Sequence, residues 1–193
     1  MAYLNVSRPN GFIPFERTAG ESERRTRPVP AVRTASTGGN ASTDLAMGDA
    51  YALDSNGNAY RAGPNDTIRG VVLGFEFQAN PLNPPGSAVN STNYVTGNGN
   101  KTGTTQIASV IGIEDNACLF ECQSDTFSAN QLGTYNLADA APDPIYAISH
   151  QTVSVGGGAG SQFKIISLKT SPGDNSYGAN ARVVGQFVQA TNA

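Results

Sequence analysis

The fold is decided by residues 47–77, MGDAYALDSNGNAYRAGPNDTIRGVVLGFEF. This stretch predicts three β-strands joined by two tight turns. The first turn contains Asn56-Gly57, and Asn-Gly is the strongest short hairpin signal because both central residues of a type I′ turn need a positive φ. The second turn is predicted at residues 63–66, where Pro64 restricts φ and its glycine, asparagine and aspartate neighbours suit a bend. The stretch therefore predicts a β-scaffold, and it carries no reactive group.

The third strand of this unit, residues 68–77, contains the apolar run Val71-Val72-Leu73, which predicts burial on both faces. Further strands are predicted at residues 106–113, 117–123, 144–155, 162–168 and 181–189, with one short helical turn at 128–133. Charged residues make up only 14% of the chain, against about 25% in typical domains, and polar turn-forming residues replace them. We therefore expect an all-β fold, an antiparallel β-sandwich or jelly-roll-like barrel.

The first 46 residues differ from the rest of the chain. They contain four prolines and no sustained periodicity, which predicts an extended N-terminal arm at 1–46, followed by a core at 47–193 with a long loop at about 78–104. Ordering such an arm costs roughly 1–2 kcal/mol per residue, so we expect it to lie on another copy or on a different protein. Residues 1–33 carry a net charge of +3 and residues 34–193 one of −6, a pattern typical of an interaction arm.

Candidate reactive groups do not assemble into a catalytic or metal-binding pattern. His150 is the only histidine, and it lies in an alternating stretch at 145–150 that predicts a strand. Cys118 and Cys122 would lie about 13 Å apart on one strand face at ~3.3 Å per residue, too far for a shared metal or a mutual disulfide, so we expect two buried thiols. Glu114 is interpreted as part of a strand-end turn. We therefore predict no catalytic, cofactor-binding or metal-binding residues, no cofactor and no enzyme activity.

Several stretches resemble small structural proteins of tailed bacteriophages, the head decoration or cement proteins. They are RPNGFIP at 8–14 with the basic, polar arm behind it, GDAYALD at 48–54 leading into DTIRGVV at 66–72, residues 117–123 followed by 127–139, and NARVVGQFV at 180–188. The resemblance implies a β-sandwich or jelly-roll domain, a homotrimer, that binds the outside of the phage head and stabilises contacts between major capsid protein subunits.

On this interpretation the arm would clamp neighbouring capsid subunits through apolar anchors and arginines. The candidate capsid-contact residues are Arg8, Phe12, Ile13, Phe15, Arg17, Arg24, Arg25 and Arg27. The expected partner is the major capsid protein, with no direct nucleic-acid binding, since the net charge is −3. No secretory signal and no run near the ~18 apolar residues of a membrane span is present, so we expect synthesis in the cytoplasm and no membrane partner. The resemblance implies that this is the cytoplasm of a host bacterium and that the protein is placed on the capsid exterior.

Three other functions remain open from the sequence. A receptor- or glycan-binding β-module of the virion would be expected to cluster exposed aromatic residues, whereas tryptophan is absent and Tyr94 and Tyr177 are scattered. A head–tail or baseplate component is a second alternative within the structural class. A β-barrel hydrolase would need an acid–base pair that the sequence does not supply.

Overall fold

The computed structural model of the chain describes residues 9–17, 24–29, 45–55, 57–77, 94–95, 108–114, 117–138, 148–169 and 175–188. Within these ranges every regular element is a β-strand, and the sheets are antiparallel. The predicted all-β antiparallel fold is confirmed. The described strands form sandwich-like sheets and do not close into a barrel.

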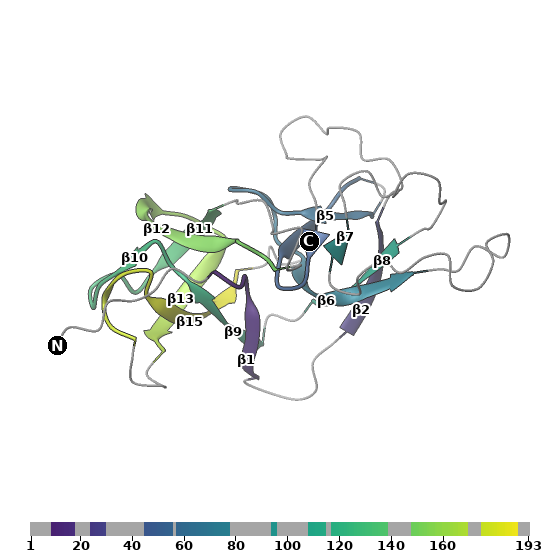
Figure 1. Ribbon diagram of the computed structural model, residues 1–193. Helices are drawn as coiled ribbons and strands as arrows, with labels where there is room; N and C mark the ends of the chain where they lie inside the picture. Colours follow the sequence, from purple (N-terminus) through teal and green to yellow (C-terminus); the bar gives the residue numbers. More distant parts are fainter. Residues whose placement is uncertain are drawn as a thin grey trace, which may run out of the picture.

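Two large sheets make up most of the molecule, the six-stranded one on the left of Figure 1 and the five-stranded one on the right. The six-stranded sheet has the order β1 (Ile13–Arg17), β9 (Cys118–Gln123), β15 (Arg182–Phe187), β13 (Phe163–Leu168), β11 (Thr134–Ala138) and β12 (Thr152–Ala159). The five-stranded sheet has the order β2 (Arg24–Val29), β8 (Ala108–Ile113), β6 (Gly70–Phe77), β4 (Ala50–Leu53) and β5 (Ala59–Arg61). Two short pairs complete the fold, β10 (Thr126–Phe127) with β14 (Gly178–Ala179) and β3 (Leu45–Ala46) with β7 (Tyr94–Val95).

The predicted three-strand unit is present as β4, β5 and β6. β4 and β5 form a hairpin, and its loop is closed by a hydrogen bond from the Asp54 amide to the Asn58 carbonyl at 2.9 Å. Gly57 in this loop has a φ of 80°, the left-handed conformation that glycine adopts without strain. β6 then pairs with β4 rather than with β5, so β4 is the central strand of the unit.

The core has two parts, one on each face of the five-stranded sheet. Val71 on β6 belongs to the main cluster, which lies between the two large sheets and includes Phe120 on β9. Its neighbour Val72 belongs to a second cluster with Tyr51 on the opposite face. The predicted burial of this strand on both faces is therefore confirmed. Both cysteines are buried and free, as the strand periodicity predicted.

Two buried glutamines join the six-stranded sheet to the β4–β6 unit. Gln151 accepts a hydrogen bond from the Ala50 amide and donates one to the Ala62 carbonyl, each at 2.7 Å. Gln162 accepts from the Leu137 amide at 2.8 Å and donates to the Asp66 carbonyl at 2.7 Å. Because a buried polar group without a partner costs about 1–3 kcal/mol, these bonds fix how the two parts meet.

The prediction that the N-terminal arm lies on another protein is wrong for the described segments 9–17 and 24–29. β1 pairs with β9 and β2 pairs with β8, so both strands belong to sheets of this chain. Their backbone groups find partners far away in the sequence, which local periodicity does not report. The rest of the predicted arm, residues 1–8, 18–23 and 30–44, lies outside the described residues.

Three other local predictions are wrong or partly wrong. Residues 128–133 form no helix but contain a hydrogen-bonded β-turn, in which the Gln131 amide donates to the Ser128 carbonyl at 3.0 Å, and the unpredicted strand β11 follows. Of the strand predicted at 144–155 the structure describes residues 148–155, in which β12 begins at Thr152, so His150 lies outside that strand. Most of the predicted loop at 78–104 lies outside the described residues, and the short strand β7 lies within it.

Candidate functional site

The two N-terminal strands form edges of the two large sheets. β1 pairs with β9 and β2 pairs with β8, and neither has a second strand partner within the described ranges. β1 also lies where the two sheets meet (Figure 1). An edge strand leaves one row of its backbone groups without a neighbouring strand, so it is available for contact with another molecule.

Side chains around β1 divide between the core and the surface. Phe12 is 1% exposed, and its ring centroid lies 5.3 Å from that of Phe163 and 4.8 Å from that of Phe187. Ile13 is 41% exposed and Phe15 is 48% exposed. The prediction of Phe12 as a capsid anchor is therefore wrong, because its ring is part of the core. Ile13 and Phe15 remain available as contact residues.

Arg27 on β2 is committed to an ion pair within the chain. Its Nε and Nη2 atoms lie 2.6 Å from the two carboxylate oxygens of Glu114, which directly follows β8. The Tyr51 hydroxyl donates to the same carboxylate at 2.7 Å, and the Arg69 Nε lies 3.1 Å from it. The guanidinium of Arg27 therefore helps to hold β2 against the adjacent strands, while its side chain stays partly exposed, and its role as a capsid contact stays a prediction.

Burial and the surrounding charges have opposite effects on Glu114. Burial raises the pKa of its carboxyl, but hydrogen bonds from Arg27 and Tyr51 together with the charges of Arg27 and Arg69 outweigh burial and lower the pKa. Burial, followed by the hydrogen bond to Glu114, raises the pKa of Tyr51 far above its ordinary value. The cluster therefore holds a carboxylate, a neutral phenol and two guanidinium groups at neutral pH.

The lowered pKa of Glu114 makes stability depend on pH. The folded state favours the ionised carboxyl, so its stabilising contribution is present above the ordinary pKa of 4.5 and is lost as the pH falls below it. At pH 7 we expect Glu114→Gln to lower the free energy of unfolding by roughly 1–3 kcal/mol, because two guanidinium groups lose their counter-charge. Urea unfolding of both proteins at pH 7, 4 and 3 would measure this, and the difference between them should shrink as the pH falls. A constant difference across that range would contradict the prediction.

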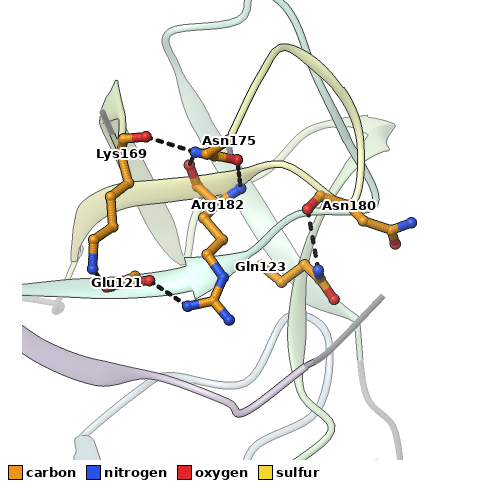
Figure 2. A network of polar contacts seen from close by, with 6 residues as sticks. All are labelled: Glu121, Gln123, Lys169, Asn175, Asn180 and Arg182. Atoms are coloured by element: carbon orange, nitrogen blue, oxygen red, sulfur yellow. Dashed lines mark hydrogen bonds and ion pairs between the residues drawn. The ribbon is translucent and has the colours of Figure 1, made fainter. Parts of the chain in front are cut away.

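A second buried carboxylate, Glu121 on β9, lies in a network of polar contacts on the six-stranded sheet (Figure 2). Lys169 contacts one of its oxygens, and Arg182 Nη1 donates to the other at 2.8 Å. Asn175 links the two cationic residues by donating to both of their backbone carbonyls at 2.7 Å. The Lys169 ammonium also lies 5.2 Å from the centroid of the Phe15 ring, so this network supports the exposed side of β1.

The other predicted contact residues occupy the same two edge strands. Arg17 ends β1, Arg24 begins β2, and the side chain of Arg25 is exposed. Arg8 lies outside the described residues. The structure therefore brings part of the predicted set to two sheet edges, while it places Phe12 in the core.

An apolar hollow of about 390 Å³ lies beside β1, at the junction of the two sheets. It is lined by residues in the segments 10–14, 47–48 and 72–73, together with Ile148, and we call it the β1 hollow. Asn10 contributes the one polar side chain among the lining residues, and none of them is ionisable. The hollow therefore suits an uncharged, apolar group.

Sequence reasoning missed the residues that complete this hollow. Met47, Leu73 and Ile148 come from segments far apart in the sequence, and Met47 and Ile148 meet through a single parallel β-bridge. Only the apolar character of these residues is visible locally, and a scattered exposed apolar residue is ordinary. Glu114 was visible as a carboxylate at a strand end, but its partners come from three other segments.

In the described part of the chain, no three histidine, cysteine, aspartate or glutamate residues are grouped as a metal site, and there is no helix of the length and apolarity that a membrane span requires. The two buried carboxylates, Glu114 and Glu121, are each held by two cationic side chains. Neither a family model nor a curated protein nor a solved structure matches this chain.

Proposed function

We propose that this protein is a virion structural protein, a cement or decoration protein that binds the outside of a tailed-phage head. The observation that carries the proposal is the pair of N-terminal strands at two sheet edges, which expose Ile13, Phe15 and Arg25. Ile13 and Phe15 are on the edge of the six-stranded sheet and Arg25 is on the edge of the five-stranded sheet, and aromatic residues and arginine are enriched at protein–protein interfaces. The resemblance of the sequence to phage decoration proteins implies the major capsid protein as the partner.

The mechanism is stabilisation by binding only the assembled shell. A protein that binds the assembled state and not its separated subunits stabilises that state in proportion to the logarithm of its concentration over its Kd. A homotrimer would present three copies of the surface at once, so a modest affinity for each copy adds up through multivalency. The protein would thereby oppose separation of neighbouring capsid subunits without any chemical step.

The contact surface in this proposal is folded and not a free arm. β1 and β2 already have their backbone partners in β9 and β8, so the partner would meet a preorganised surface. Preorganisation lowers the entropy cost of binding. Deleting residues 1–43 would remove both strands and Phe12 from the fold, and point substitutions are therefore the appropriate test.

The test is cosedimentation of the full-length protein with purified capsids. Phe15→Asp and Arg25→Glu are each expected to weaken binding by roughly tenfold or more, since they alter exposed residues on the two N-terminal edge strands. Ile166→Asp is the matched control, because Ile166 is similarly exposed, at 43%, but lies on β13. Stoichiometric binding by the unaltered protein, lost in the first two variants and retained in the control, would support the proposal. Absence of binding by the unaltered protein, combined with capture of a glycan, would overturn it.

A further inference from the structure

Two residues that line the β1 hollow, Phe12 and Gly48, have backbone amides that are already hydrogen-bonded within the chain. The Phe12 amide donates to the Gly48 carbonyl at 2.8 Å, and the Gly48 amide donates to the Val72 carbonyl at 2.8 Å. These bonds join the segment before β1, the segment between β3 and β4, and β6. A ligand that enters the hollow therefore meets apolar side chains over paired backbone, which favours an apolar ligand over a polar one.

The rim of the hollow is made of large, exposed apolar side chains. Met47 is 45% exposed and Ile148 is 37% exposed, and Ile13 stands beside them on β1. The β-bridge between Met47 and Ile148 holds two of the three rim residues together. Methionine adapts its shape to a partner because its side chain is unbranched and polarisable. The rim thus extends the hollow into an apolar patch continuous with the exposed surface of β1.

The edge of β1 is poorly suited to pairing with an added strand. Pro14 has no amide hydrogen to donate, and the register with β9 shifts between Pro14 and Glu16, which marks a bulge. Prolines and bulges at an edge oppose edge-to-edge strand pairing. A partner at this edge is therefore expected to bind through side chains and not by β-augmentation.

We infer that the β1 hollow accepts an uncharged apolar side chain, such as phenylalanine or leucine, from a partner protein surface. The lining without ionisable groups, the paired backbone amides of Phe12 and Gly48 and the blunted strand edge all favour this occupant over a charged ligand or an added strand. Small, fully desolvated pockets that receive one anchor side chain are typical hot spots of protein interfaces. The identity of the partner as the capsid rests on the function proposed above, whereas the chemistry of the occupant does not.

The test uses the chain's own methionines. The sequence contains two, Met1 and Met47, so protein labelled with ¹³C at the methionine methyl groups reports on the rim of the hollow through one of two signals. Titration with N-acetyl-L-phenylalaninamide is expected to shift the Met47 signal saturably. N-acetyl-L-aspartic acid amide, which carries a carboxylate, should leave it unchanged. No saturable shift, or equal shifts with the two probes, would overturn the inference.

Two variants and one further measurement separate the alternatives. Ile148→Asp places a charge on the rim and should abolish the shift, and Ile166→Asp on β13 should retain it. A Met47 signal that changes with protein concentration without any probe, together with a doubled mass in solution, would assign the hollow to a second copy and overturn the partner assignment.

The same variants distinguish this inference from the proposed function. If the unaltered protein binds the probe and Ile148→Asp no longer binds capsids, the result supports a capsid side chain as the occupant. If the unaltered protein binds the probe but Ile148→Asp still binds capsids fully, that assignment is overturned and the proposed function is retained. Probe binding by a protein that does not bind capsids overturns the proposed function and supports the apolar side-chain site alone.

Discussion

Replacing Phe12 by alanine is expected to lower the free energy of unfolding by about 3–5 kcal/mol, the range for a phenylalanine removed from a packed core. The ring is buried against Phe163 and Phe187, which also contact each other with centroids 5.1 Å apart. Aromatic pairs in tilted and edge-on arrangements add about 0.5–1.5 kcal/mol beyond burial. The loss would leave a cavity between the two sheets where β1 enters the core.

Phe15→Ala is the matched control for this prediction. Phe15 is on the same strand but half exposed, and its recorded ring contact is the Lys169 ammonium, so we expect a loss of no more than about 1 kcal/mol. Urea unfolding followed by circular dichroism measures both values. Equal, small losses in the two variants would contradict the structure, because they would mean that Phe12 lies on the surface in solution, as an arm residue would.

Gly11→Ala is expected to destabilise the protein by roughly 2–5 kcal/mol through backbone strain and overpacking. Gly11 has a φ of 66°, a conformation that residues with a Cβ rarely adopt. An added Cβ would lie 2.3 Å from the Gly48 carbonyl oxygen and 2.5 Å from the Ser149 Cβ atom. Three chain segments cross at this point directly behind the β1 hollow, so the substitution should also disturb the Met47 methyl signal.

Gly57→Ala measures the cost of backbone strain without the steric crowding that Gly11→Ala adds. Gly57 also has a positive φ, 80°, but no heavy atom lies within 4 Å of the position of an added Cβ. We expect a loss of only about 1–2 kcal/mol, the conformational penalty alone. Thermal unfolding of the two variants measures the difference, which reports the steric conflict at Gly11. Equal losses at the two positions would show that the three segments do not cross as tightly as the structure places them.

The interpretation of the N-terminal edges as a contact surface depends on how the charged side chains near them are paired. Glu114 and Glu121 each pair with two cationic side chains, and Arg27 belongs to the first of these clusters. Among the predicted contact residues whose side chains the structure describes, Ile13, Phe15 and Arg25 are exposed at the N-terminal edges. A surface of this kind is suited to association with another protein, and the proposed function assigns it to the capsid.

The sequence by itself determined the features that depend on near neighbours in the chain. The turns at Gly57 and around Pro64, the burial of Val71 and Val72 on opposite faces, and the inert placement of Cys118 all follow from turn chemistry and from the two-residue period of a strand. Those signals do not require knowledge of any distant segment. They were sufficient to predict an all-β, antiparallel fold.

Only the tertiary structure decided which residues of the N-terminal region are surface and which are core. Phe12 and Ile13 are adjacent apolar residues, and the position of Phe163 and Phe187 buries the first and leaves the second exposed. Likewise Arg27 differs from its neighbour Arg25 because Glu114 lies within reach of one and is bonded to it. The physical reason is that burial and ion pairing depend on contacts between segments far apart in sequence, and such contacts leave no local pattern to read.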